Sequence, residues 1–127
     1  MVIKQIRLST KAKDSLVKLK AKTGIQNWNV LCRWAFCYSI REGTVPLDLP
    51  MNTVSNVEMS WETFGGEYAF LYDALIMNWC RDHNISTNKD SLAKYFRLHL
   101  ERGISHLAGT GLIRSLDDLV DKAMEAI

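Results

Sequence analysis

Hydrophobic and polar positions follow two different periods at the start of the chain, and they predict a short strand followed by a helix. Residues 3–8 mix apolar and β-branched side chains with polar ones, which is compatible with a strand. From residue 11 to residue 22 the period is helical, with Ser9-Thr10 suited to cap the helix and Gly24 suited to end it. The apolar residues that share one face of this helix are Ala12, Leu16 and Leu19.

A second helix is predicted from residue 29 to residue 41, and it is apolar on nearly every side. A helix of this kind is buried over most of its surface. Because a chain of this size offers little material to surround the helix, we expect a second subunit to cover part of it. The side chains assigned to this oligomer interface are Leu31, Trp34, Phe36 and Tyr38.

The rest of the chain predicts one irregular connection and three further helices. Residues 44–65 hold both prolines and show no helical period, apart from a short extended piece near 54–59. The expected helices run from 66 to 83, from the capping pattern at 87–90 to about 107, and from 115 to the C-terminus. We therefore expect one mainly α-helical domain over residues 1–127. It would be a bundle of about five helices, with a strand and helix–helix start at 1–43, the connection at 44–65 and a helical part at 66–127.

The composition is that of a cytoplasmic protein. The chain has 127 residues and 47% apolar content, both ordinary for one globular domain. No apolar run approaches the roughly 18 to 20 residues that cross a bilayer, and residues 1–4 lack the features of a signal peptide. We therefore expect no membrane contact. The cysteines, Cys32, Cys37 and Cys80, show no C-x-x-C spacing, so we expect them to be reduced thiols.

Positive charge is concentrated in the first third of the chain. Residues 1–43 hold nine of the sixteen Lys and Arg residues and two of the fourteen Asp and Glu residues, a net charge of about +7. The remaining residues hold seven basic and twelve acidic groups, a net charge of about −5. Such segregation is typical of a protein that faces nucleic acid. The residues assigned to DNA binding are Lys4, Arg7, Lys11, Lys13, Lys18, Lys20 and Lys22.

The lysines of the first helix favour contact with phosphates over the reading of bases. Lys11, Lys18 and Lys22 fall on one side of the helix, and Lys13 and Lys20 border its apolar stripe on the other edge. Lysine contacts with phosphates position a protein on DNA without specifying sequence. The alternative is that these lysines only solvate the helix surface and complement its dipole.

The sequence predicts neither a metal site nor a catalytic group. Cys80 and His83 lie one helical turn apart, and His99 and His106 lie two turns apart, but a metal site needs three or four convergent ligands. We expect thiols and imidazoles packed in the bundle, no cofactor and no enzymatic activity. The two cysteines of the second helix look buried, and we expect them to be structural rather than sulfur carriers.

One predicted helix carries a polar cluster and a glycine. Arg97 and Glu101 are four residues apart and can pair, next to His99 and Arg102. The cluster either lines an assembly or partner surface or pairs within the helix around a packed His99, and we favour the second reading. Gly103 costs roughly 1 kcal/mol relative to Ala in a helix, which indicates close approach of another helix, and its replacement by Leu is expected to disrupt assembly.

Several stretches together resemble one known family. They are Ile6-Arg7-Leu8-Ser9 with Leu19-Lys20-Ala21-Lys22-Thr23-Gly24, residues 31–39, Gly66-Glu67-Tyr68 leading to Ala74-Leu75-Ile76, and residues 96–104. In this order and spacing they resemble the DndE family of DNA phosphorothioation proteins over nearly the whole chain. The resemblance implies an oligomeric helical protein, a tetramer rather than a dimer. It also implies binding of double-stranded or nicked DNA beside the other proteins of the sulfur modification system, which carry out the chemistry.

Two other functions remain open from the sequence. A ribbon-helix-helix transcription regulator would place strand residues Gln5 and Arg7 in the major groove as a dimer, although the helices after residue 66 exceed what such a repressor needs. An enzyme, for instance a nickase or a sulfur carrier, is disfavoured because no catalytic cluster is evident.

Overall fold

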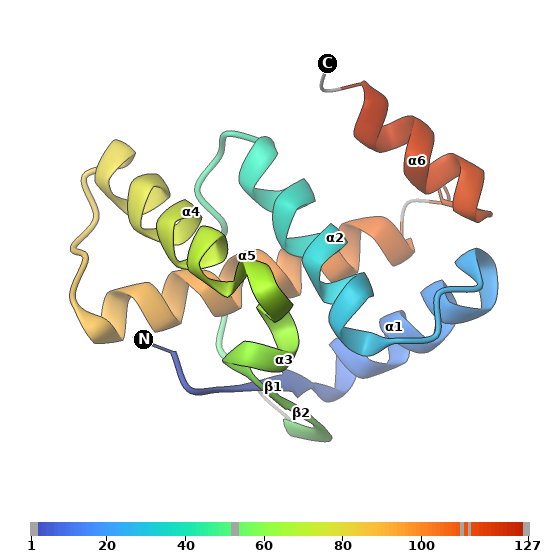
Figure 1. Cartoon of the computed structure of the whole chain (residues 1–127), viewed down its shortest axis with the longest axis horizontal. Coiled ribbons are helices and arrows are strands. Elements are labelled where there is room, and N and C mark those ends of the chain that lie inside the picture. The colour runs from blue at the N-terminus through green and yellow to red at the C-terminus, as the bar shows by residue number, and fades with distance from the viewer. Residues whose placement is uncertain (1–2, 52–53, 110, 112, 126–127) are drawn as a thin grey trace.

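The structure, a computed structural model, describes residues 3–51, 54–109, 111 and 113–125. Most of them are helical, which confirms the predicted mainly α-helical class. Figure 1 shows the elements in chain order: β1 (Gln5–Ser9), α1 (Thr10–Thr23), α2 (Trp28–Arg41), β2 (Val54–Ser60), α3 (Trp61–Gly65), the 3-10 turn η1 (Gly66–Tyr68), α4 (Ala69–Asp82), α5 (Lys89–Gly109) and α6 (Leu116–Met124).

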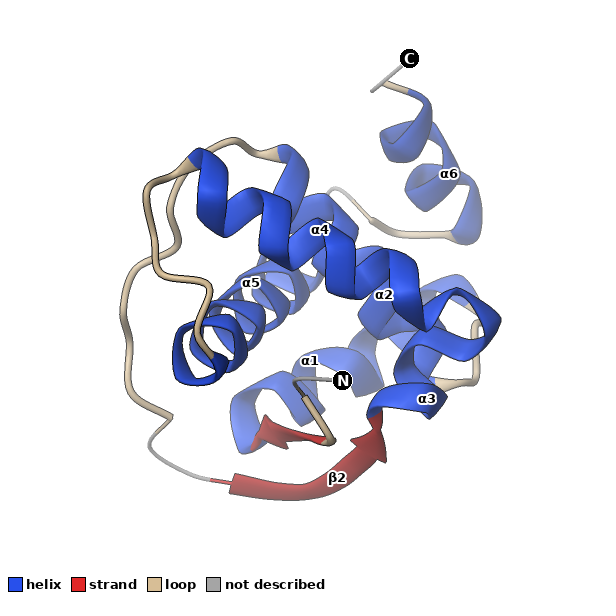
Figure 2. Ribbon diagram, turned by 60° about the vertical axis from the view of Figure 1, so that its left-hand side comes forward, coloured by secondary structure: helices blue, strands red, loops and turns tan. Residues whose placement is uncertain are grey.

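The two strands form an antiparallel ribbon beside α1 and α3 (Figure 2). Gln5 lies opposite Ser60 and Arg7 lies opposite Glu58, with an irregularity before the end of β1. Alternate side chains point to opposite faces of a strand, and here the inner face is apolar and buried while the outer face is exposed. The buried apolar residues of the ribbon are Ile6, Leu8, Val57 and Met59.

The first helix begins and ends where the sequence predicts. The Ser9 hydroxyl accepts a hydrogen bond from the Ala12 amide at 3.0 Å, which satisfies one of the free donors at the helix start. Gly24 ends the helix at φ +78°, a left-handed conformation that glycine adopts without strain. The face that packs on the core consists of Ala12, Leu16, Leu19 and Thr23.

Helix α5 is the centre of the fold and contacts α1, α2, α4 and β1. Its approach to α2 is so close that a Cβ at Gly103 would lie 1.9 Å from the carbonyl oxygen of Ala35. The close packing predicted for Gly103 is therefore confirmed. The contact lies within one chain, however, so the expected effect of substitution on assembly becomes an effect on folding.

Helix α2 is covered mainly by its own chain, and the expectation that a second subunit covers part of it stays a prediction. Phe36 packs against Phe96 at 4.9 Å between ring centroids and against Phe64 at 6.1 Å. Leu31 and Phe36 are 1% and 0% exposed, so they offer no surface to another subunit. Trp34 and Tyr38 are only half-buried, and a role for these two in oligomer contacts stays a prediction.

The predicted connection at 44–65 contains a helix that the sequence pattern does not predict. The Ser60 hydroxyl accepts a hydrogen bond from the Thr63 amide at 3.0 Å, and α3 follows with Trp61 and Phe64 fully buried. A helix of five residues is too short to show a 3.6-residue period, which explains why it could not be distinguished from irregular chain.

Candidate nucleic-acid interface

The lysines of α1 are five basic residues on one helix that lack acidic partners in the described part of the chain, as do six of the other eleven Lys and Arg residues. Among the described residues, no Asp or Glu forms an ion pair with any of the five lysines of α1. Elsewhere Arg7, Lys94, Arg102, Arg114 and Lys122 all pair with a carboxylate. The lysines of α1 are therefore not held in ion pairs, and Asp14 is the one acidic residue on this helix.

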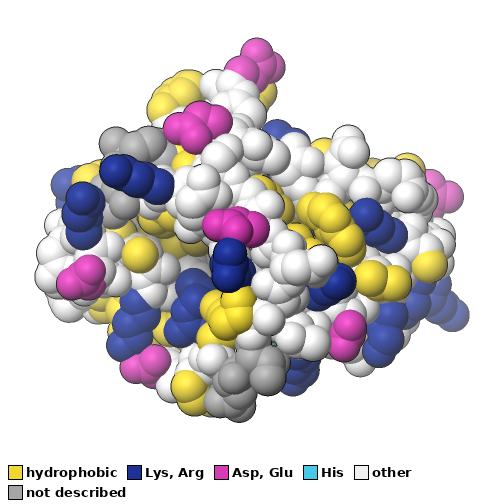
Figure 3. All heavy atoms as spheres, turned by 90° about the horizontal axis from the view of Figure 1, so that it is seen from below, with side chains coloured by type: hydrophobic (Ala, Val, Ile, Leu, Met, Phe, Trp, Pro, Cys, Tyr) yellow, Lys and Arg dark blue, Asp and Glu magenta, His cyan; other side chains and the backbone are white. Residues whose placement is uncertain are grey.

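The five lysines of α1 form two rows rather than one patch. Lys13 donates to the side-chain oxygen of Asn56 in β2 at 2.6 Å, so one row lies toward the ribbon. Lys11 lines a cavity beside α5, so the other row lies on the opposite flank. Figure 3, which views the molecule from the side of the ribbon and α1, shows basic side chains spread over this face with hydrophobic and some acidic side chains between them.

The other lysines assigned to DNA binding differ in how exposed their side chains are and in whether they contact another element. Lys4, Lys11 and Lys18 are exposed, and Lys22 is half-buried. The Lys20 ammonium lies 3.7 Å from the ring centroid of Trp28, a cation–π contact that holds this side chain against the start of α2.

Arg7 is less available for DNA than its place in the sequence indicates. Its guanidinium donates to a carboxylate oxygen of Glu58 at 2.6 Å across the ribbon. Both side chains are largely exposed, so the pair contributes at most about 1 kcal/mol to stability. The charge of Arg7 is nevertheless partly cancelled at the surface where a phosphate would bind.

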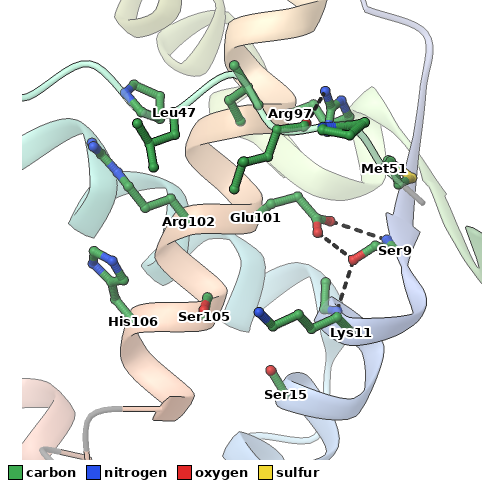
Figure 4. Close-up of a pocket in the computed structure, with 15 residues that line it drawn as sticks. Ser9, Lys11, Ser15, Leu47, Met51, Arg97, Glu101, Arg102, Ser105 and His106 are labelled. Carbon is green, nitrogen blue, oxygen red and sulfur yellow. Dashed lines mark hydrogen bonds between the residues drawn. The ribbon is translucent and has the colours of Figure 1, made fainter. Parts of the chain in front are cut away.

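A cavity of about 480 Å³ opens between the start of α1, the segment 46–51 and α5 (Figure 4). Lys11 and Arg97 lie on its wall, and Glu101 lies between them and points toward Ser9. Glu101 accepts hydrogen bonds from the Ser9 amide at 3.2 Å and from the Ser9 hydroxyl. Arg97 donates weakly to the Leu49 carbonyl at 3.4 Å. The predicted pairing of Arg97 with Glu101 is therefore wrong, because Glu101 instead serves the start of α1.

Arg102 fixes the end of α2 and is not free to bind a ligand. Its guanidinium donates to the hydroxyl and carbonyl of Ser39 and to the hydroxyl and carbonyl of Thr44, at 2.8 to 3.0 Å. His99 is fully buried next to it, with Nδ1 2.8 Å from the Ser39 hydroxyl. Burial, together with the nearby charge of Arg102, lowers the pKa of His99 to about 3. The packed His99 predicted from the sequence is confirmed.

The cysteines are poor nucleophiles in their surroundings. Cys32 and Cys80 are fully buried, and burial raises the pKa of Cys32 to about 12. Cys37 is exposed, contrary to the expectation that both cysteines of α2 are buried, yet desolvation raises the pKa of this thiol as well. A thiol with a raised pKa holds little thiolate near neutral pH, and the thiolate is the reactive form.

In the part of the chain that the structure describes, no three His, Cys, Asp or Glu side chains converge as a metal site would require.

Helix α4 exposes an apolar strip, in which Phe70, Leu71 and Leu75 are 66%, 47% and 38% exposed. An exposed strip of large apolar side chains is typical of a surface that binds another protein.

No helix among the described residues combines the length and the apolar character needed to cross a membrane.

Fold and surface together define a small helical protein with a lysine-rich helix next to a two-stranded ribbon. The family model described as "DNA sulphur modification protein DndE" matches residues 5–115. The chain belongs to the DndE family. The resemblance noted in the sequence is thereby confirmed.

Solved structures share the fold. One is the crystal structure of DndE from Escherichia coli B7A, described as involved in DNA phosphorothioation modification. It is 24% identical with a TM-score of 0.66, and the match covers 84% of this chain and 99% of that chain. A DndE mutant with two glycine-to-lysine substitutions matches with 24% identity and a TM-score of 0.62, over 82% of this chain and 95% of the other. None of the curated proteins matches this sequence.

The ribbon-helix-helix alternative is not favoured by these findings. In such a dimer the first strand pairs with its copy in the second subunit, whereas here β1 pairs with β2 of the same chain. The matches to DndE also extend far beyond the N-terminal helices, over residues 5–115.

Proposed function

We propose that this chain is a DNA-binding subunit of the phosphorothioation system that holds duplex DNA, intact or nicked, through the lysines of α1 without reading sequence. The observation that carries the proposal is that five lysines on one helix have no acidic partner among the described residues, although the chain as a whole has nearly balanced charge. Phosphates of the DNA backbone would supply the missing negative charge.

The spacing of the lysines supports backbone contact rather than base reading. Two lysine rows on opposite flanks of α1 suit two lines of phosphates better than the edges of bases in a groove. Gln5 is exposed on the ribbon, but its neighbour Arg7 is occupied by Glu58. Sequence preference is therefore not part of the proposal.

The proposal assigns the sulfur chemistry to other proteins of the system. The raised pKa values of Cys32, Cys37 and Cys80 support this assignment, because a sulfur carrier needs a thiolate. The chain would act by holding DNA and would work in the cytoplasm, where DNA is modified.

Self-association would allow one particle to contact DNA with several α1 helices. We assign it to the exposed strip of α4, with Trp34 and Tyr38 of α2 as further candidates. A tetramer is preferred over a dimer. Light scattering should give a multiple of 14.5 kDa for the native chain and a lower mass for Phe70→Asp. A native particle of 14.5 kDa at micromolar concentration would refute self-association.

Fluorescence anisotropy with intact and nicked duplexes of several sequences, over a salt series, tests the DNA proposal. We expect sequence-independent binding that weakens steeply as salt rises. Lys18→Glu with Lys22→Glu should weaken binding at least tenfold. The slope of log affinity against log salt should become shallower by about 0.9 for each phosphate that the variant no longer neutralises.

The matched control for that experiment is Arg81→Glu with Lys89→Glu. These residues are exposed at the far ends of α4 and α5, and the substitutions change net charge by the same amount. Equal loss of affinity in both double variants would mean that binding follows net charge rather than α1. Unchanged affinity in a folded Lys18 and Lys22 variant would place the DNA surface elsewhere.

A further inference from the structure

The cavity between the start of α1, the segment 46–51 and α5 has room for a small ligand. Its volume of about 480 Å³ lies within the range of about 300 to 1,000 Å³ that is typical of small-molecule sites. Its walls come from three parts of the chain that are far apart in the sequence, so the fold as a whole shapes it (Figure 4). Of the described residues assigned to DNA contact, Lys11 is the one that lines it.

The side chains that line this cavity carry a net positive charge. Lys11, Arg97 and Arg102 supply three positive charges, and Glu101 supplies the one negative charge among the lining residues that the structure describes. Glu101 directs both carboxylate oxygens to Ser9, one to the amide and one to the hydroxyl (Figure 4). Opposite charges attract, so the cavity favours an anionic ligand over a cationic one.

One cation and two hydroxyls near the start of α1 are available to a phosphate. Lys11 forms no ion pair with a described residue, and in Figure 4 its side chain extends from α1 toward α5. Ser15 of α1 and Ser105 of α5 line the cavity near it, and neither hydroxyl forms a hydrogen bond with a described residue. An ammonium group beside hydroxyl donors is suited to bind phosphate oxygens.

The other end of the cavity suits a sugar or a base. Its apolar wall consists of Pro46, Leu47, Leu49, Pro50 and Met51. Arg97 lies beside this wall, with one weak hydrogen bond at 3.4 Å to the Leu49 carbonyl. A guanidinium can stack on a flat ring, and apolar side chains line most small-molecule pockets. An ion pair between Asp48 and Lys94 at 2.6 Å holds the segment against α5, and Asp48 itself does not line the cavity.

We propose that this cavity binds the terminal phosphate group of a nucleotide. Lys11, Ser15 and Ser105 bind the phosphate. The sugar and base lie between Arg97 and the apolar wall. A terminal phosphate carries a charge of about −1.5 to −2 near pH 7, whereas a phosphate within a DNA backbone carries about −1. The positively charged cavity therefore binds a strand end in preference to the continuous backbone.

The nucleotide is either the phosphorylated end of a DNA strand or a free mononucleotide. Lys11 lies both in this cavity and in the row of α1 that contains Lys18 and Lys22, so a strand that follows the row reaches the cavity at its end. This continuity favours the end of a DNA strand, and to that extent the inference rests on the proposed function.

The test compares Lys11→Gln with the matched control Lys18→Gln. Both substitutions remove one exposed positive charge from the same row of α1, and Lys11 lines the cavity whereas Lys18 does not. Ser15→Leu is a second variant, which narrows the cavity without changing the charge. Circular dichroism melting verifies that all three variants fold.

Two measurements separate the two sources of the nucleotide. Fluorescence anisotropy at about 50 mM salt, where electrostatic contacts are weakly screened, gives the dissociation constants for an intact duplex and for nicked duplexes. The nick carries either a phosphate or a hydroxyl, on its 5′ side or its 3′ side. Isothermal titration calorimetry with deoxyadenosine monophosphate and with deoxyadenosine tests the free nucleotide.

We expect the native chain to bind a nick with a phosphate about five- to tenfold more tightly than the same nick with a hydroxyl. Lys18→Gln should keep this ratio while it weakens binding of every duplex, and Lys11→Gln and Ser15→Leu should lose the ratio. Binding of deoxyadenosine monophosphate but not of deoxyadenosine, lost in the same two variants and without preference among nicks, would assign the cavity to a free nucleotide.

No preference among nicks together with no binding of deoxyadenosine monophosphate overturns the inference, and binding of intact duplex then leaves the proposed function standing. A preference that Lys11→Gln and Ser15→Leu both retain also overturns it, because the terminal phosphate would bind elsewhere. If no duplex binds, the proposed function is refuted, and the titration with deoxyadenosine monophosphate alone decides whether the cavity binds a nucleotide.

Discussion

Replacing Gly103 by Ala tests how closely α5 packs on α2. The added Cβ would lie 1.9 Å from the Ala35 carbonyl oxygen and 2.5 Å from its carbonyl carbon. Real Cβ atoms essentially never lie within 3.0 Å of a non-bonded heavy atom, so the two backbones must move apart by about 1 Å. The atoms that are struck belong to the backbone, and a side-chain rotation cannot relieve the overlap.

The expected loss of stability combines two opposing effects. Overpacking a core costs about 1 to 3 kcal/mol, and a clash with backbone belongs at the upper end of that range. Alanine regains about 1 kcal/mol because it favours the helix more than glycine does. The net result for Gly103→Ala is a free energy of unfolding lower by about 2 kcal/mol. For a chain of this length that corresponds to a melting temperature lower by about 6 to 8 °C.

Urea denaturation and thermal melting, both followed by circular dichroism, measure the effect. Gly109→Ala is the matched control on the same helix, since a Cβ there would meet no heavy atom within 4 Å. The control should be as stable as the native chain or up to about 1 kcal/mol more stable. If Gly103→Ala were as stable as Gly109→Ala and only changed the particle mass, the close contact would lie between subunits and the intramolecular packing would be wrong.

Three further predictions concern the buried polar groups and the thiols. Because the folded-state pKa of His99 is about 3 and its unfolded value is 6.5, the unfolded chain binds the proton first, and stability should fall as pH falls from 6.5 toward 3. The free energy of unfolding measured in urea should be lower by about 2 to 3 kcal/mol at pH 4.5 than at pH 6.5. This pH dependence should be smaller in His99→Gln and unchanged in His106→Gln, whose side chain is partly exposed. Arg102→Met should lower the free energy of unfolding in urea by about 2 to 4 kcal/mol, because it leaves the buried hydroxyl and carbonyl of Ser39 without this donor. An unchanged unfolding midpoint would show that Arg102 does not stabilise the end of α2. In a thiol-labelling assay on the folded chain, exposed Cys37 should react first and Cys32 only on unfolding, whereas labelling of both at one rate would contradict the burial of Cys32.

The helices with a full apolar stripe were predictable, because burial imposes a period that the sequence must carry. The helix at 11–22 was expected with its cap at Ser9-Thr10 and its end at Gly24; in α1 the cap is Ser9 and the helix ends at Gly24. The ribbon was predictable only as two separate extended pieces. Which strand pairs with which depends on contacts between residues far apart in the sequence, and no local pattern records them.

The candidate site shows the same limit. Charge counting identified the basic helix, since net charge is a property of composition. It could not foresee that Glu58 would occupy Arg7, that Asn56 would bond Lys13, or that Trp28 would hold Lys20. Each of these partners comes from another element. Phe36 was assigned to an oligomer contact because a helix that is apolar on all sides does not reveal which of its neighbours covers it.

The register of the ribbon also has a consequence for the order of folding. It joins Gln5 to Ser60, so the connection between the paired positions contains all of α1 and α2. Closing so long a loop has an entropic cost that is offset only once the two strands have paired. Helices, in contrast, form from contacts between residues close in sequence. During synthesis the lysines of α1 emerge more than thirty residues before Asn56 and β2 exist to support them. The basic helix can therefore form early, and the strand that fixes its flank is added later.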